Sequence, residues 1–153
     1  MSVQLPKELE GTILPTGQRK KPSLRDVLSD KDLAALGDSY LNFLYSVSLS
    51  SKLGRPAGDK IKGSILSTAL KESGLREVLP KRIDRHDQAD ALEALAAYTW
   101  IEELLSFRRA LKMLCSYEDL TKGMIELALK MREVFERHQR ENFIPQEERK
   151  TMN

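Results

Sequence analysis

The sequence has few of the residues on which disulfide and zinc sites depend. Its 153 residues include one cysteine, Cys115, and two histidines, His86 and His138. A single cysteine excludes an internal disulfide, and a reducing cytoplasm is the expected compartment. Because no C-x-x-C or H-E-x-x-H arrangement occurs, no zinc site is expected, and Cys115 is predicted to be a small core residue.

Long apolar runs and a large excess of one charge are also missing. The longest mostly apolar stretch, 89–101, contains Asp90 and Glu93 and is too short to cross a bilayer. The opening MSVQLPKELEGTILPTG shows no basic region followed by an apolar core, so no export signal is expected. With 41% hydrophobic and 31% charged residues and a net charge of +2, the chain is typical of globular proteins and not of membrane-spanning ones.

The length suits one domain, which buries roughly two-thirds of its unfolded surface. Residues 1–22 hold three prolines and two glycines without apolar periodicity, which predicts an extended or disordered arm. Residues 23–144 are expected to form the domain and 145–153 a tail. No alternating pattern long enough for a strand occurs, so the predicted fold class is all-α.

Apolar spacing between proline and glycine breaks predicts the positions of the helices. They are expected over 30–52, 57–73, 87–105, 107–115 and 117–141, with a short turn at 75–79. Ser29 or Asp30 is expected to cap the first of these, and Ser116 with Asp119 to form a capping box before the last. Gly37 costs about 1 kcal/mol inside a helix unless a neighbouring element approaches closely there. The apolar stripe of the last helix is predicted to comprise Leu120, Met124, Leu127, Leu129, Met131 and Val134.

Three carboxylates stand in apolar surroundings on two of these helices. Asp38 lies within LAALGDSYL, and Asp90 and Glu93 share one helix face within QADALEALAAY. An ionised carboxylate in a packed face is costly unless it is paired or binds a cation. Mg²⁺ suits such groups because it takes one or two protein carboxylates together with waters and phosphate oxygens. Pairing with arginines, or faces that point to solvent, would explain the same pattern.

The segments around these carboxylates resemble the endonuclease domain of the ribonuclease III family. LAALGDSYLNFL, 33–44, resembles its signature helix, in which an L-G-D-A-x-L core carries a metal-binding Asp. ADALEALAAYTWIE, 89–102, resembles its second motif, A-D-x-x-E-A-L-I-G-A-x-Y, and ALKESGLREVLP, 69–80, resembles the A-R-E-L-G-L-G-D-Y-L segment between them. The three occur in the family's order, and the resemblance covers roughly 23–143.

This resemblance implies an Mg²⁺-dependent endoribonuclease, with Mn²⁺ as a substitute, that leaves a 5′-phosphate and a 3′-hydroxyl. Asp38 and Glu93 would be the catalytic residues, and Asp38, Asp90 and Glu93 would hold the metal. The implied partners are double-stranded or structured RNA and a second copy of the chain, with no membrane. Between residues 52 and 85, nine Lys and Arg stand against four Asp and Glu, which fits either a solvated surface or a polyanion-binding face. From this segment the candidates for RNA phosphate contacts are Lys60, Lys62, Lys81, Arg82 and Arg85.

Several positions depart from the family pattern. Ala34 and Lys31 stand where the signature helix has Glu residues, and Ser64 stands where a carboxylate is frequent. The compact Mini-III ribonucleases share the Ala and lack a double-stranded-RNA-binding domain, for which the expected tail leaves no room, although their pattern often lacks Asp90. A catalytically inactive RNA-binding or structural module therefore stays an alternative, as does a helical interaction domain with an accidental motif match.

The stretch LEALAAYTWI, 92–101, is rich in small residues and carries Tyr98 and the single Trp100. Such a surface suits close helix packing. It is consistent with a homodimer interface and equally with burial in the domain's own core.

Overall fold

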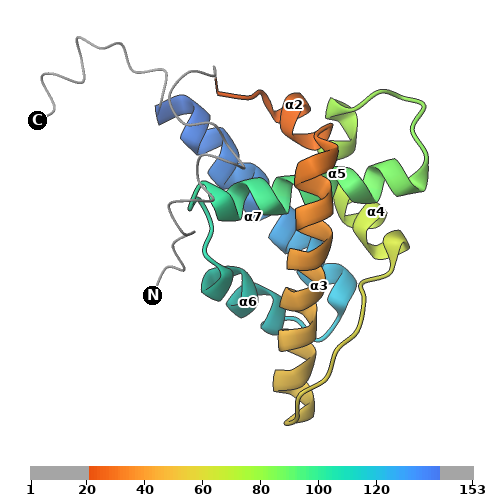
Figure 1. The fold of residues 1–153 in the computed structure, drawn as a ribbon, viewed down its shortest axis with the longest axis vertical. Coiled ribbons are helices and arrows are strands. Elements are labelled where there is room, and N and C mark those ends of the chain that lie inside the picture. Colours follow the sequence, from red (N-terminus) through yellow and green to blue (C-terminus); the bar gives the residue numbers. More distant parts are fainter. Residues whose placement is uncertain (1–20, 142–153) are drawn as a thin grey trace, which may run out of the picture.

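The computed structural model describes residues 21–141, so the expected tail and all but the last two residues of the expected arm lie outside this range. Within it the chain is helical and contains no strand (Figure 1). The elements are α2 (Leu24–Leu28), α3 (Lys31–Leu53), α4 (Gly63–Glu72), the short 3-10 helix η1 (Leu75–Val78), α5 (Arg85–Ile101), α6 (Phe107–Cys115) and α7 (Leu120–Glu141). The predicted all-α class is confirmed.

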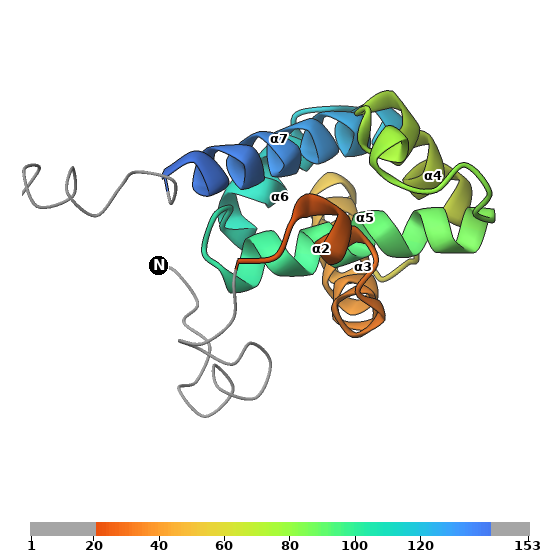
Figure 2. The same cartoon turned by 90° about the horizontal axis from the view of Figure 1, so that it is seen from above.

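Helix α5 is central and contacts α2, α3, α4 and α7. Figure 2 shows α3 crossing on one side of α5, with α4 and α7 on the other. Ten residues of α5 from Ala89 to Thr99 are buried, and five of them are alanines whose short side chains allow neighbouring helices to approach. Tyr98 packs on Phe135 of α7 with ring centroids 5.4 Å apart. The face of α5 around Tyr98 therefore belongs to the domain's own core, and at its end Trp100 and Ile101 are partly exposed.

The closest approach between α3 and α5 occurs at Gly37. A Cβ atom built there would collide with the backbone carbonyl of Glu93 and lie 3.0 Å from its Cα. Of the two explanations for this glycine, close approach is therefore the correct one. The contact fixes Asp38, the next residue of α3, beside Glu93.

Side-chain caps determine where several helices begin. Asp30 accepts hydrogen bonds from two backbone N–H groups at the start of α3, and Asp84 does so from Asp87 N at the start of α5. Helix α5 therefore starts two residues earlier than expected. The capping box predicted from Ser116 and Asp119 is absent, because Ser116 ends α6 and Asp119 accepts its bond from Thr121 N. The short helix α2 was not predicted.

The helix expected over 57–73 was wrong in its first six residues, because residues 55–62 are not helical and α4 begins at Gly63. Asn42, Ser46 and Ser50 are spaced by four along one side of α3. Their side-chain oxygens accept hydrogen bonds of 2.9–3.0 Å from backbone N–H groups of the non-helical segment. The donors are Ile61, Asp59 and Ala57 respectively. These bonds offer the backbone an alternative to helix formation.

Two residues that were predicted to be buried are more exposed than expected. Leu129 of the α7 stripe is 40% exposed, whereas Met124, Leu127, Met131 and Val134 are buried. Cys115, expected in the core, is only partly buried and lies 3.5 Å from Ser48 Oγ.

The first described residues lie beside the C-terminal end of α7. Lys21 Nζ is 3.1 Å from His138 Nε2, and Gln139 Nε2 donates to the carbonyl of Pro22 at 3.4 Å. Among residues 21–141, no helix combines the length and the apolar character that crossing a bilayer requires.

Candidate active site

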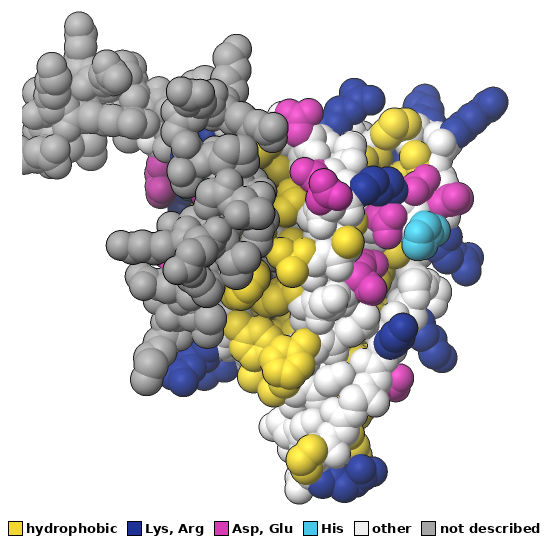
Figure 3. All heavy atoms as spheres, in the orientation of Figure 1, with side chains coloured by type: hydrophobic (Ala, Val, Ile, Leu, Met, Phe, Trp, Pro, Cys, Tyr) yellow, Lys and Arg dark blue, Asp and Glu magenta, His cyan; other side chains and the backbone are white. Residues whose placement is uncertain are grey.

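An open pocket of about 420 Å³ lies where α3, α5 and the start of α4 meet. Asp38 reaches it from α3, and Asp90 and Glu93 reach it from α5. In Figure 3, acidic side chains gather beside a histidine on this side of the molecule, and Lys and Arg side chains lie above and below them. The structure thus brings the three carboxylates to one pocket, although Asp38 and Asp90 are 52 positions apart in the sequence.

Asp38 is oriented by a residue that the sequence analysis missed. Asn42 Nδ2 donates to Asp38 Oδ1 at 2.9 Å, while Asn42 Oδ1 accepts from Ile61 N at 2.9 Å. One amide therefore fixes the carboxylate of Asp38 and ties the segment before α4 to α3. The i,i+4 spacing of Asp38 and Asn42 was the available signal, because such residues are neighbours on a helix.

Glu93 is buried, with 6% of its surface exposed, although it carries an ionisable group. Burial, with a smaller contribution from the nearby carboxylates of Asp38 and Asp90, raises its pKa to about 8. An acid in these surroundings is stabilised by a proton or by a cation. The site therefore favours binding of positive charge between Glu93 and Asp38.

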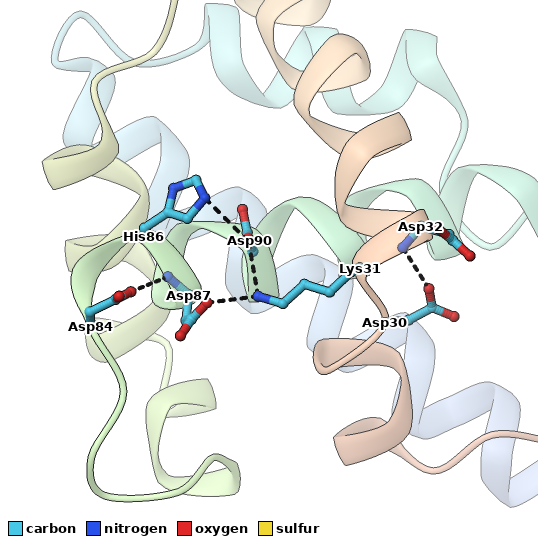
Figure 4. A network of polar contacts seen from close by, with 7 residues as sticks. All are labelled: Asp30, Lys31, Asp32, Asp84, His86, Asp87 and Asp90. Carbon is cyan, nitrogen blue, oxygen red and sulfur yellow. Dashed lines mark hydrogen bonds and ion pairs between the residues drawn. The ribbon is translucent and has the colours of Figure 1, made fainter.

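Asp90 has a different environment, drawn in Figure 4. Lys31 Nζ donates to Asp90 Oδ2 at 3.0 Å and to Asp87 Oδ1 at 2.7 Å. His86 Nε2 lies 3.7 Å from the same oxygen of Asp90. Asp90 is thus paired with a lysine. The alternative that arginines pair with Asp38 and Glu93 is not met among residues 21–141, because no Lys, Arg or His there forms a salt bridge with either acid. Asp38 is instead exposed to solvent.

The charge on Lys31 is reinforced by its partners. Its hydrogen bonds to Asp87 and then to Asp90 raise the pKa of Lys31 above the ordinary lysine value. The bond from Lys31 in turn lowers the pKa of Asp87. Lys31 therefore carries its positive charge near neutral pH.

The donor set fits a hard divalent cation at Asp38 and Glu93. Two carboxylates with space for waters and phosphate oxygens are the usual protein contribution to an Mg²⁺ site. Asp90 is engaged by Lys31, and within residues 21–141 no group of three His, Cys, Asp or Glu side chains is arranged to hold a metal ion. The predicted sharing of one ion by all three carboxylates stays a prediction.

The five basic residues predicted to contact RNA are all exposed. Lys60 and Lys62 flank the pocket-lining Ile61 in the segment before α4. Arg85 begins α5 directly before the pocket-lining His86, and Lys81 and Arg82 lie in the segment that precedes α5. Basic side chains therefore stand on two elements that border the pocket. Ser64 lies in α4 and does not line the pocket.

Comparison with known proteins agrees with the motif resemblance. No curated protein matched the chain. A family model described as Ribonuclease III matches residues 31–137, a range that contains α3 to α6, most of α7 and every residue that lines the pocket. The chain belongs to the ribonuclease III family.

Proposed function

We propose that this protein is an endoribonuclease that hydrolyses phosphodiester bonds of double-stranded or structured RNA in RNA processing. The observation that carries the proposal is the pair of acids at the crossing of α3 and α5. Glu93 is buried, its pKa is raised to about 8 by burial and by the neighbouring Asp38, and both acids line one open pocket. Family membership supplies the reaction class, and these two residues supply its chemistry.

The two acids have the role of holding Mg²⁺, which when bound supplies positive charge for the phosphoryl group and lowers the pKa of a coordinating water. Asn42 orients Asp38, and Gly37 allows α3 to approach the backbone of Glu93. The exposed lysines and arginines beside the pocket bind RNA phosphates. A cytoplasmic location stays a prediction that rests on the single cysteine.

We also propose that the protein acts as a homodimer through a row of aromatic side chains on α3, α5 and α6. Phe43 is 61% exposed and stacks on Phe107 with centroids 5.6 Å apart. Phe107 contacts Tyr40, which stacks on Trp100. A second copy would remove this apolar surface from water.

The test is cleavage of double-stranded RNA in Mg²⁺ by the wild type and by Asp38→Asn and Glu93→Gln. We expect each variant to lose more activity than the roughly 10–100-fold that is typical when a residue only orients a metal ligand. The matched control is Asp32→Asn, which changes an exposed acid of α3 that does not line the pocket and should retain activity. Equal cleavage by wild type and both pocket variants would contradict the assignment.

A catalytically inactive RNA-binding module is the second candidate. Ala34 stands where the family pattern has a Glu; it lines the pocket and is 3% exposed. Lys31 donates a hydrogen bond to Asp90, which therefore already has a partner. Salt-sensitive RNA binding that is unchanged by EDTA, with no cleavage in Mg²⁺ or Mn²⁺, would favour this candidate.

A further inference from the structure

The ammonium group of Lys31 lies in the same pocket as Asp38 and Glu93. It extends from the first residue of α3 across to α5, where Asp87 and Asp90 both accept its hydrogen bonds (Figure 4). The pocket thus has two parts. One holds the ammonium group of Lys31 between two aspartates. The other holds the two acids that form no salt bridge with a basic side chain of the described residues.

The chemistry of these two parts differs. Asp90 Oδ2 already accepts a hydrogen bond from Lys31 at 3.0 Å, so a positive charge stands beside it. A divalent ion placed there would have to displace the ammonium and would be repelled by it at short range. Glu93 has the opposite problem, because burial and the nearby carboxylate of Asp38 disfavour its ionised form, and no basic side chain of the described residues forms a salt bridge with it.

Many enzymes that cleave phosphodiester bonds hold two divalent ions about 3.5–4 Å apart. We propose that in this protein Lys31 takes the place of the second ion, so that each pocket binds a single ion at Asp38 and Glu93. The inference rests on the proposed function, which needs that ion. Lys31 is then a positioning residue: it holds Asp90 and supplies the second positive charge from the protein itself. It does not contact the reacting atoms.

The test is the number of Mn²⁺ ions bound per chain, measured on the full chain without RNA by electron paramagnetic resonance of free Mn²⁺ and by calorimetry. We expect one ion for the wild type and for Lys31→Arg, which keeps the charge. We expect two ions for Lys31→Glu, because a third carboxylate then joins Asp87 and Asp90. Lys122→Glu makes the same charge change on α7 away from the pocket and should leave one ion.

A second variant covers the case in which Lys31→Glu does not fold, as judged by circular dichroism. Lys31→Gln removes only the charge, and we expect it to bind the first ion about fivefold more tightly because the repulsion is gone. Each of three results would overturn this inference and leave the proposed function intact: two ions bound to the wild type, one ion bound to folded Lys31→Glu, or unchanged Mn²⁺ affinity in Lys31→Gln. No Mn²⁺ binding by the wild type, or binding unaffected by Asp38→Asn, would overturn the proposed metal-dependent function as well.

Discussion

Glu93 is the residue whose surroundings conflict most with its charge. It is buried in the central helix, and the acids nearest to it are themselves negative. Proteins accept such a conflict at sites where function requires it, and removing the conflict commonly stabilises the fold. The free energy needed to ionise Glu93 in the folded protein should therefore appear in the pH dependence of the free energy of unfolding.

We expect Glu93→Gln to stabilise the protein by about 1–2 kcal/mol above pH 8 in the absence of divalent ions. In the wild type the folded pKa of about 8 exceeds the ordinary value of 4.5, so the folded state retains a proton that the unfolded state releases. Stability of the wild type should consequently fall as pH rises from 4.5 to 8 and level off above that range. Urea unfolding at several pH values measures this slope.

The slope should be absent in Glu93→Gln and retained in Glu118→Gln, which changes an exposed acid in the loop before α7. Addition of Mg²⁺ should stabilise the wild type and not Glu93→Gln. Parallel pH profiles for the wild type and Glu93→Gln would show that Glu93 is ionised in the folded protein without cost.

The sequence pointed to Asp38, Asp90 and Glu93 because charged residues interrupt apolar helix faces there. It could not reveal that Lys31 and Asp90 form an ion pair, since that contact depends on the angle at which α3 crosses α5. Asn42 was overlooked for a similar reason. Its role depends on the hydrogen bond from Ile61 N, and this bond forms only when the segment before α4 packs against α3.

Among the elements, the crossing of α3 and α5 decides the geometry of the pocket. Because Gly37 contacts the backbone of Glu93, a larger side chain cannot be accommodated by a change of rotamer. The two helices would have to move apart. Such a movement would also separate Asp38 from Glu93.

We expect Gly37→Ala to destabilise the protein by about 2 kcal/mol, because overpacking outweighs the gain in helix propensity of about 1 kcal/mol. The matched control is Gly63→Ala in α4, where an added Cβ would meet no atom within 4 Å. That variant should be neutral or slightly more stable. Urea unfolding of both compares them directly, and equal stability of Gly37→Ala and the wild type would show that the helices can separate without cost.

Most helices could be predicted because their boundaries are local: prolines, glycines and capping aspartates stand near the ends of α3, α4 and α5. The segment 55–62 could not be predicted in this way. Its sequence permits a helix, but Asn42, Ser46 and Ser50 on α3 bind its backbone instead. Competition between local propensity and bonds to a distant helix is not visible in one segment alone.

For the whole molecule, the aromatic row should determine the association state. We expect Phe43→Ser to convert a dimer into a monomer in sedimentation at micromolar concentration, because it removes the most exposed ring of that row. Leu129→Ser is the control, since Leu129 is also exposed but lies on α7. A wild type that sediments at 17.4 kDa would contradict the dimer proposal.

The basic side chains beside the pocket should act through charge and not through base contacts. We expect Lys62→Ala to weaken binding of all double-stranded RNA sequences to a similar extent. It should also lower the slope of log K against log salt by about one. Lys122→Ala on α7 serves as control and should leave the slope unchanged. A loss restricted to certain sequences would show that Lys62 reads bases.

The contact of Lys21 and Pro22 with the end of α7 has a consequence for engineering the molecule. The first described residues and the C-terminal end of α7 therefore lie side by side at one edge of the domain. Figure 1 shows the N-terminal end of α5, which borders the pocket, on the opposite side. A circular permutant that joins residue 141 to residue 21 would need only a short linker. Cargo fused at that edge would leave the pocket open.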